Sequence, residues 1–190
     1  MARNGYLRPP EEVDMAREER AIRRAGVAAL LISGVAFAAG WYVLPRLFPF
    51  PTDLAERLAF GVQASAFVLL WVVAGVLMVS TGRRRSAADI GGSAAGPPSG
   101  RLAIKAAFLQ NTLEQAVLAA GAYLALGTLL SGAWLSLIVV AVALFAVGRV
   151  LFYVGYPQGA GGRALGMTLT MTPTILGYLL AVVLVAMRLF

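Results

Sequence analysis

The chain has no cysteine and no histidine among its 190 residues. The absence of cysteine excludes disulfide bonds and any thiolate nucleophile of the protein's own. The absence of histidine removes the commonest ligand of zinc, copper and haem iron, so we predict no metal site. A reaction here would have to use arginine, tyrosine, hydroxyl or carboxylate groups, or a bound molecule that brings its own reactive group.

Charged residues are also scarce. They make up 13% of the chain, whereas 59% of the residues are hydrophobic. A soluble domain carries roughly a quarter of charged residues, so this composition excludes a soluble globular protein. The 16 Lys and Arg against 9 Asp and Glu give a net charge of +7, but the basic residues lie between apolar runs. This distribution indicates membrane lipids as the partner, and no nucleic acid.

Five apolar runs are long enough to cross a bilayer, which takes about 20 helical residues. We therefore predict an all-α integral membrane protein. A cytoplasmic tail covers 1–24, and an additional transmembrane helix with a periplasmic loop covers 25–57. A four-helix domain covers 58–190 and contains a flexible cytoplasmic loop, 82–105. The first run could be a signal peptide, with Ala36-Phe37-Ala38 as its cleavage site. The segment before it is long and holds five acidic residues, unlike a short basic leader, which favours a retained helix. The predicted spans are 25–44, 58–81, 106–130, 133–156 and 164–187.

The basic residues predict the orientation of these spans. With the N-terminus in the cytoplasm, twelve Lys and Arg fall on the cytoplasmic side and only Arg46, Arg57 and Arg188 on the other. Because cytoplasmic loops are enriched in Lys and Arg, we predict a cytoplasmic N-terminus and a periplasmic C-terminus. The cytoplasmic set is Arg3, Arg8, Arg17, Arg20, Arg23, Arg24, Arg83, Arg84, Arg85, Arg101, Lys105 and Arg163.

Two ionisable residues lie inside the predicted spans, where a charge is costly and points to function. Glu114 and Arg149 lie at similar depths on two spans joined by a very short turn near 130–132. These spans are expected to be antiparallel neighbours, so we predict a Glu114–Arg149 pair. The pair could hold the bundle together or form part of a site.

Further polar groups share these helix faces. Asn111 is three residues before Glu114, and Tyr153 and Tyr156 follow Arg149 at i+4 and i+7. They predict a polar cleft with an aromatic wall at the cytoplasmic side, although one tyrosine could belong to an interfacial belt. The glycine-rich segment 156–163 is interpreted as a flexible connector that lets Arg163 face the cleft; Arg163 could instead be a topological anchor.

The run from Gly148 to Tyr156, followed by Arg163, resembles the MAPEG superfamily, the membrane-associated proteins in eicosanoid and glutathione metabolism. The family's Arg, aromatic, Tyr and Arg spacing falls on Arg149, Phe152, Tyr156 and Arg163, and 111–115 resembles its Asn-x-x-Glu element. The resemblance covers about 58–190, so the chain is identified as a bacterial-type member with an additional N-terminal transmembrane helix.

The resemblance implies a homotrimer in the bacterial inner membrane that binds glutathione as a co-substrate. It implies a glutathione-dependent transferase or peroxidase acting on lipophilic electrophiles, with Arg163 and Tyr156 as catalytic residues. The implied glutathione-binding residues are Asn111, Glu114, Arg149, Tyr153, Tyr156 and Arg163.

Two departures from the family pattern support a different class of function. Ala107 stands where the family often has an arginine, and Phe152 stands where it has a tyrosine. Together with the additional helix, they favour a catalytically silent scaffold or accessory subunit of a larger membrane complex. A transporter or channel is a third hypothesis, but one internal acid and one internal arginine give little support for an ion-conducting path.

Overall fold

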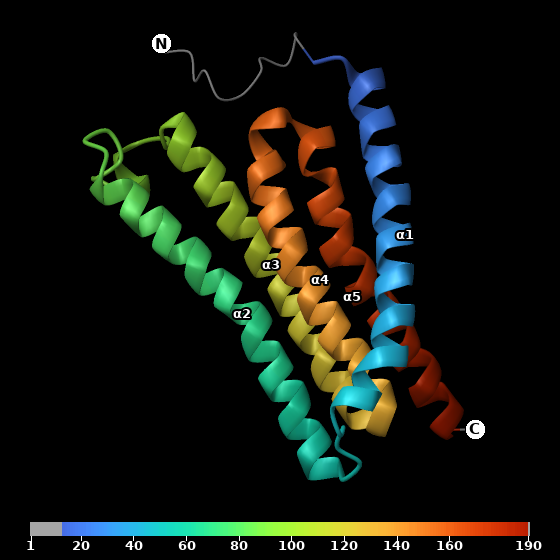
Figure 1. The fold of residues 1–190 in the computed structure, drawn as a ribbon. Helices are drawn as coiled ribbons and strands as arrows, with labels where there is room; N and C mark the ends of the chain where they lie inside the picture. The colour runs from blue at the N-terminus through green and yellow to red at the C-terminus, as the bar shows by residue number, and fades with distance from the viewer. Residues whose placement is uncertain (1–12, 190) are drawn as a thin grey trace.

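A computed structural model describes residues 13–189, in which five α-helices form an up-and-down bundle (Figure 1). All five are long and apolar enough to cross a membrane, as the sequence predicts. The helices are α1 (Met15–Leu47), α2 (Leu54–Arg84), α3 (Gly100–Leu129), α4 (Ser136–Gly155) and α5 (Ala160–Leu189).

Side-chain caps explain why three of these helices begin before the apolar runs do. Asp14 accepts a hydrogen bond from the Arg17 amide, and Asp53 accepts one from Ala55. Ser99 does the same for Leu102 at the start of α3. Each cap satisfies an amide that a helix start leaves without a partner, and so extends the helix beyond the bilayer-length segment.

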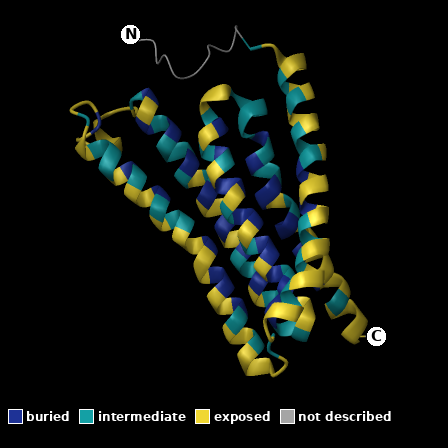
Figure 2. Ribbon diagram, in the orientation of Figure 1, coloured by how far each residue is buried: buried dark blue, intermediate teal, exposed yellow. Residues whose placement is uncertain are grey.

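The helices pack as two antiparallel pairs with one additional member. α2 lies along α3, α4 lies along α5, and α1 runs beside α5 and α4 on the side away from α2 (Figure 1). Buried positions gather in α3, α4 and α5, whereas α1 and α2 are mostly exposed (Figure 2). The exposed side chains of α1 and α2 are largely apolar, as expected for helices that face lipid.

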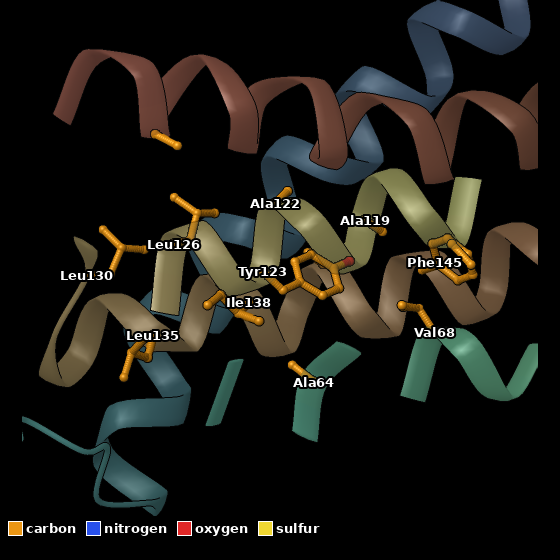
Figure 3. Packing of buried hydrophobic residues seen from close by; sticks show 13 residues of the cluster. Ala64, Val68, Ala119, Ala122, Tyr123, Leu126, Leu130, Leu135, Ile138 and Phe145 are labelled. Atoms are coloured by element: carbon orange, nitrogen blue, oxygen red, sulfur yellow. The ribbon is translucent and has the colours of Figure 1, made fainter. Parts of the chain in front are cut away.

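The main core lies where α2, α3 and α4 meet. Tyr123 of α3 packs among Ile138 and Phe145 of α4, with Ala64 and Val68 of α2 closing the cluster (Figure 3). Small residues let the helix axes approach closely, because a Cβ atom on Gly61 would lie 2.9 Å from the Tyr123 carbonyl oxygen.

Glycines also set the α4–α5 contact that places the candidate site. A Cβ atom on Gly166 would lie 2.2 Å from the Phe152 backbone nitrogen, and one on Gly155 would lie 2.1 Å from the Gly162 carbonyl oxygen. Real Cβ atoms do not approach so closely, so glycine is required at both positions. The two helices are thereby in backbone contact at the end of the bundle that carries the connecting turn.

The connector between α2 and α3 covers residues 85–99 and includes a short 3-10 turn, η2 (Ser93–Ala95). Buried Asp89 accepts hydrogen bonds from the Ser99 amide at 2.8 Å and from the Ser99 hydroxyl at 2.6 Å. These donors lower the pKa of Asp89, because they stabilise the carboxylate more than the acid. Because α2 ends at Arg84 and α3 begins at Gly100, the predicted loop, 82–105, includes the last turn of α2 and the first turns of α3.

Candidate functional site

Arg149 lies at the centre of a buried polar network that joins three helices. Its side chain, on α4, has no exposed surface. Nη1 donates to Asn111 Oδ1 of α3 at 2.7 Å, and Nη2 donates to the Thr170 hydroxyl of α5. The guanidinium carbon also lies 4.8 Å from the ring centroid of Phe152, a cation–π contact. The network therefore fixes the relative positions of α3, α4 and α5.

The predicted pair between Glu114 and Arg149 is wrong for the single chain. Glu114 is exposed on α3, where its carboxylate accepts a hydrogen bond from Gln110 Nε2 at 2.8 Å. No ion pair joins Glu114 to Arg149 within residues 13–189, and the guanidinium donates to Asn111 and Thr170 instead. A step of three residues turns a helix by about 300°, so Glu114 is rotated about 60° from Asn111. That rotation leaves Asn111 facing Arg149 and places Glu114 on the outer surface.

Tyr156 and Arg163 meet at the turn between α4 and α5. Tyr156 begins the 3-10 turn η4 (Tyr156–Gln158), and Arg163 lies in the first turn of α5. The guanidinium carbon of Arg163 is 4.6 Å from the centroid of the Tyr156 ring. This contact holds the cationic group against an aromatic face while the guanidinium edges remain open to hydrogen bonding.

Aromatic rings connect this pair to the bundle interior. Tyr156 packs edge-on against Phe152 with 5.5 Å between ring centroids, and Phe108 of α3 packs against Tyr153 at 5.2 Å. Phe108 and Phe152 are themselves 6.4 Å apart. The predicted aromatic wall is therefore a continuous row from α3 to the α4–α5 turn.

The glycine-rich segment before Arg163 differs from the flexible connector that the sequence suggests. Most of it is helical, with η4 followed by α5 from Ala160 onward, and Gly159 makes the bend with φ of +92°. Because this φ is rarely accessible to other residues, glycine is needed at the bend. Arg163 is therefore held on a helix.

A cavity of about 580 Å³ opens beside Tyr156 and Arg163. One wall is the turn between α4 and α5, and the other is the first two turns of α1, including Glu18 and Glu19. Its volume lies in the range of small-molecule sites, roughly 300–1,000 Å³. Sequence reasoning missed both glutamates, because nothing in the sequence shows where α1 packs.

The predicted site residues thus divide into three groups. Asn111 and Arg149 form the buried network, which includes the unpredicted Thr170. Tyr156 and Arg163 line the cavity, and Tyr153 packs against Phe108 in the aromatic row. Glu114 stands apart on the surface of α3. The only sequence signal for Thr170 is the run of alternating threonines at 168–174, in which Thr170 and Thr174 are four residues apart and share one face of α5.

These features define a helical membrane protein with a buried arginine network and an arginine–tyrosine cavity at one end of its bundle. The chain belongs to the MAPEG family, whose model matches residues 59–183. The match covers α3, α4 and nearly all of α2 and α5, and it leaves α1 outside. Comparison with curated proteins and with solved structures found no match.

Proposed function

We propose that the protein is a membrane-bound glutathione-dependent transferase or peroxidase that acts on lipophilic electrophiles. The observation that carries this proposal is the contact of Arg163 with Tyr156 at the edge of a cavity of about 580 Å³, inside a domain that belongs to the MAPEG family. Membership supports a role in glutathione chemistry, and the chain has no cysteine that could supply a thiol.

The residues at the cavity suit the binding of a thiol-containing tripeptide. Glutathione, when bound, would supply the nucleophilic sulfur. The Arg163 guanidinium would stabilise a thiolate, because a neighbouring positive charge lowers the pKa of a thiol. The Tyr156 hydroxyl is the next available donor at the same edge. Arg149 is fully buried and both of its Nη atoms donate to neighbouring helices, so we assign it the positioning of α3, α4 and α5.

We further propose that the protein works as a homotrimer, with Glu114 contributed to a neighbouring subunit. Gln110 and Glu114 are exposed on a helix that is long and apolar enough to span the membrane. A carboxylate facing lipid would be strongly unfavourable, so a second copy of the chain is the natural cover for this face. In a trimer, Glu114 and Tyr153 could join Tyr156 and Arg163 of another subunit around one bound glutathione.

The location that fits these proposals is a bacterial inner membrane with a cytoplasmic N-terminus. The basic residues in the first turns of α1, at the end of α2 and at the start of α3 lie at the same end of the bundle as Arg163 at the start of α5, and these helix ends are at the top of Figure 1. Arg46, Arg57 and Arg188 lie at the opposite end. Two of the basic residues used for the orientation, Arg3 and Arg8, lie outside the described residues.

Glutathione-dependent thermal stabilisation of the detergent-purified protein tests the proposal. Glutathione at 100 times its dissociation constant should add about 2.7 kcal/mol to the free energy of unfolding. Arg163→Ala should reduce the ultraviolet absorbance of bound thiolate and lower turnover while retaining much of the ground-state binding. Arg188→Ala, at the opposite end, is the matched control. No stabilisation at millimolar glutathione would contradict the proposal.

One observation favours the second candidate, a catalytically silent scaffold or accessory subunit. Both Nη atoms of Arg149 donate to groups of the same chain, and its neighbour Phe152 lacks the hydroxyl of the family tyrosine. A scaffold needs the network for rigidity alone. It would show no glutathione-dependent stabilisation, yet Arg149→Met would still destabilise it.

A further inference from the structure

The end of the bundle where α2 is joined to α3 carries a surplus of positive charge. Residues 83–105 contain one acidic side chain, Asp89, and five basic ones, namely Arg83, Arg84, Arg85, Arg101 and Lys105. Asp89 is buried, and its two carboxylate oxygens accept hydrogen bonds from Ser99. The one acid of this segment is therefore held inside the connector, and the exposed charges of the segment are basic.

Contacts within the chain fix two of these basic residues at the end of α2. Arg83 Nη2 donates to the Ser93 hydroxyl at 2.8 Å, which ties the last turn of α2 to the connector. Lys105 lies across the same turn, where its Nζ is 3.3 Å from the position that a Cβ atom on Gly82 would take. Glycine at position 82 leaves room for this ammonium group, so Lys105 of α3 adds its charge to the end of α2.

Arg84 stands at the end of an apolar stripe on α2. It lies seven residues after Leu77 and eleven after Val73. Both steps are close to a whole number of helical turns, so the three side chains share one face of the helix. Leu77 is 58% exposed and Val73 is 53% exposed, as expected for side chains that face lipid. Arg84 and the adjacent Arg85 are exposed as well, so this face is apolar within the span and cationic at its end.

We propose that this face of α2 binds an anionic phospholipid, whose phosphate lies at Arg84 and Arg85 and whose acyl chain lies along Leu77 and Val73. Basic clusters next to a membrane-spanning helix attract anionic headgroups. A guanidinium can also donate two parallel hydrogen bonds to one phosphate, which adds geometric selection to the attraction of charge. Lys105 contributes a further positive charge at the same helix end.

The arrangement favours an anionic lipid over a zwitterionic lipid or a soluble anion. The ammonium or choline group of a zwitterionic headgroup would lie among like charges, since Asp89 is buried and bonded to Ser99. Glu18 and Glu19 belong to α1, which lies on the side of the bundle away from α2 (Figure 1). A soluble phosphate would contact the arginines alone, whereas a lipid also covers the exposed apolar stripe. The proposal does not depend on glutathione chemistry.

Thermal unfolding of the full-length protein in a neutral detergent, with lipid added, tests the proposal. The probes are phosphatidylglycerol, which is anionic, and phosphatidylcholine with the same acyl chains. Phosphatidylglycerol should raise the Tm at much lower concentration than phosphatidylcholine. Equal responses to the two lipids would overturn the selection of an anionic headgroup.

Two double variants of exposed arginines locate the site. Each basic residue near an anionic lipid surface strengthens binding about fivefold, so Arg84→Gln with Arg85→Gln should raise the phosphatidylglycerol concentration at half-maximal stabilisation by about thirtyfold. Arg84→Lys with Arg85→Lys keeps the charge and should restore most of this loss. The matched control is Arg20→Gln with Arg23→Gln, which removes the same charge from α1 at the same end of the bundle and should leave that concentration unchanged.

Equal losses in the two glutamine variants would show a general attraction to this end of the bundle and would overturn the site on α2. Glycerol phosphate, which carries the phosphate without acyl chains, should give no comparable stabilisation at the same ionic strength. Stabilisation by glycerol phosphate alone would assign a site for free anions and would likewise overturn the lipid site. Because glutathione is absent from all of these measurements, this proposal and the proposed function fail separately.

Discussion

The partners of Arg149 provide the most informative test of the bundle. The substitutions are Thr170→Val, which removes the hydroxyl and keeps the shape, and Arg149→Met, which removes the guanidinium and keeps much of the length. Glu114→Gln serves as the comparison, because the sequence alone pairs Glu114 with Arg149 whereas the structure pairs Thr170 with it.

The expected magnitude follows from burial and charge. Neutral hydrogen bonds between membrane helices average about 0.6 kcal/mol. Hydrogen bonds of a charged donor are roughly twice as strong as neutral ones, and the Arg149 side chain has no exposed surface. We therefore expect a coupling free energy of about 1 to 2 kcal/mol between Thr170 and Arg149. The coupling between Glu114 and Arg149 should stay below about 0.5 kcal/mol, as for residues without a shared contact.

The assay is a double-mutant cycle on the free energy of unfolding in mixed detergent, followed by circular dichroism. Thr170→Val should be much less destabilising in the Arg149→Met background than alone. Additive effects for Thr170 together with strong coupling for Glu114 would refute the network as described. That result would restore the pair expected from the sequence.

Three further predictions test other parts of the molecule. Gly166→Ala should destabilise the bundle by more than about 2 kcal/mol, because its Cβ would meet the Phe152 backbone at 2.2 Å, whereas Gly34→Ala, with open space around it, should be near neutral in thermal unfolding. Asp89 has a lowered pKa in the folded protein, so its stabilisation of the connector should be complete above the unfolded pKa of about 3.9 and lost as the pH falls through the lower folded value. Limited proteolysis across this acidic range should show the loss, and Asp89→Asn should abolish the pH dependence. Ala94→Cys, on the exposed connector, should be labelled by a membrane-impermeant maleimide only from the cytoplasmic side; labelling from the periplasm would reverse the proposed orientation.

The existence of the five helices could be predicted from the sequence because lipid imposes one strong rule. Charges must lie outside the apolar segments, so the spaces between them mark the spans directly. The ends of the helices were harder to predict from the sequence, since a cap depends on local geometry. α1 begins at Met15, ten residues before the predicted span, because Asp14 caps it and its polar first turns lie outside the apolar segment.

The buried network shows where sequence reasoning about the site stops. The depth of Arg149 and the need for a polar partner follow from the sequence, but several partners satisfy that need. Asn111 and Glu114 both lie within reach of the facing helix by spacing alone. The rotation of α3 decides between them, and that rotation is set by the contacts of the whole bundle. Thr170 is reached only because glycines bring α5 against α4.

The position of α1 could not be predicted for a related reason. A lipid-facing helix is apolar on most sides, so its hydrophobic pattern does not identify the face that packs against protein. The contact combines packing of Ala29 in a cluster with Val140, Leu144 and Leu169 and a hydrogen bond between one carboxylate and one glycine that are 143 residues apart, Glu18 and Gly161. Neither Glu18 nor Gly161 stands out in its own segment. Together these contacts place a helix from outside the family match against the turn that holds Arg163, so the chemistry of the cavity depends on both parts of the chain.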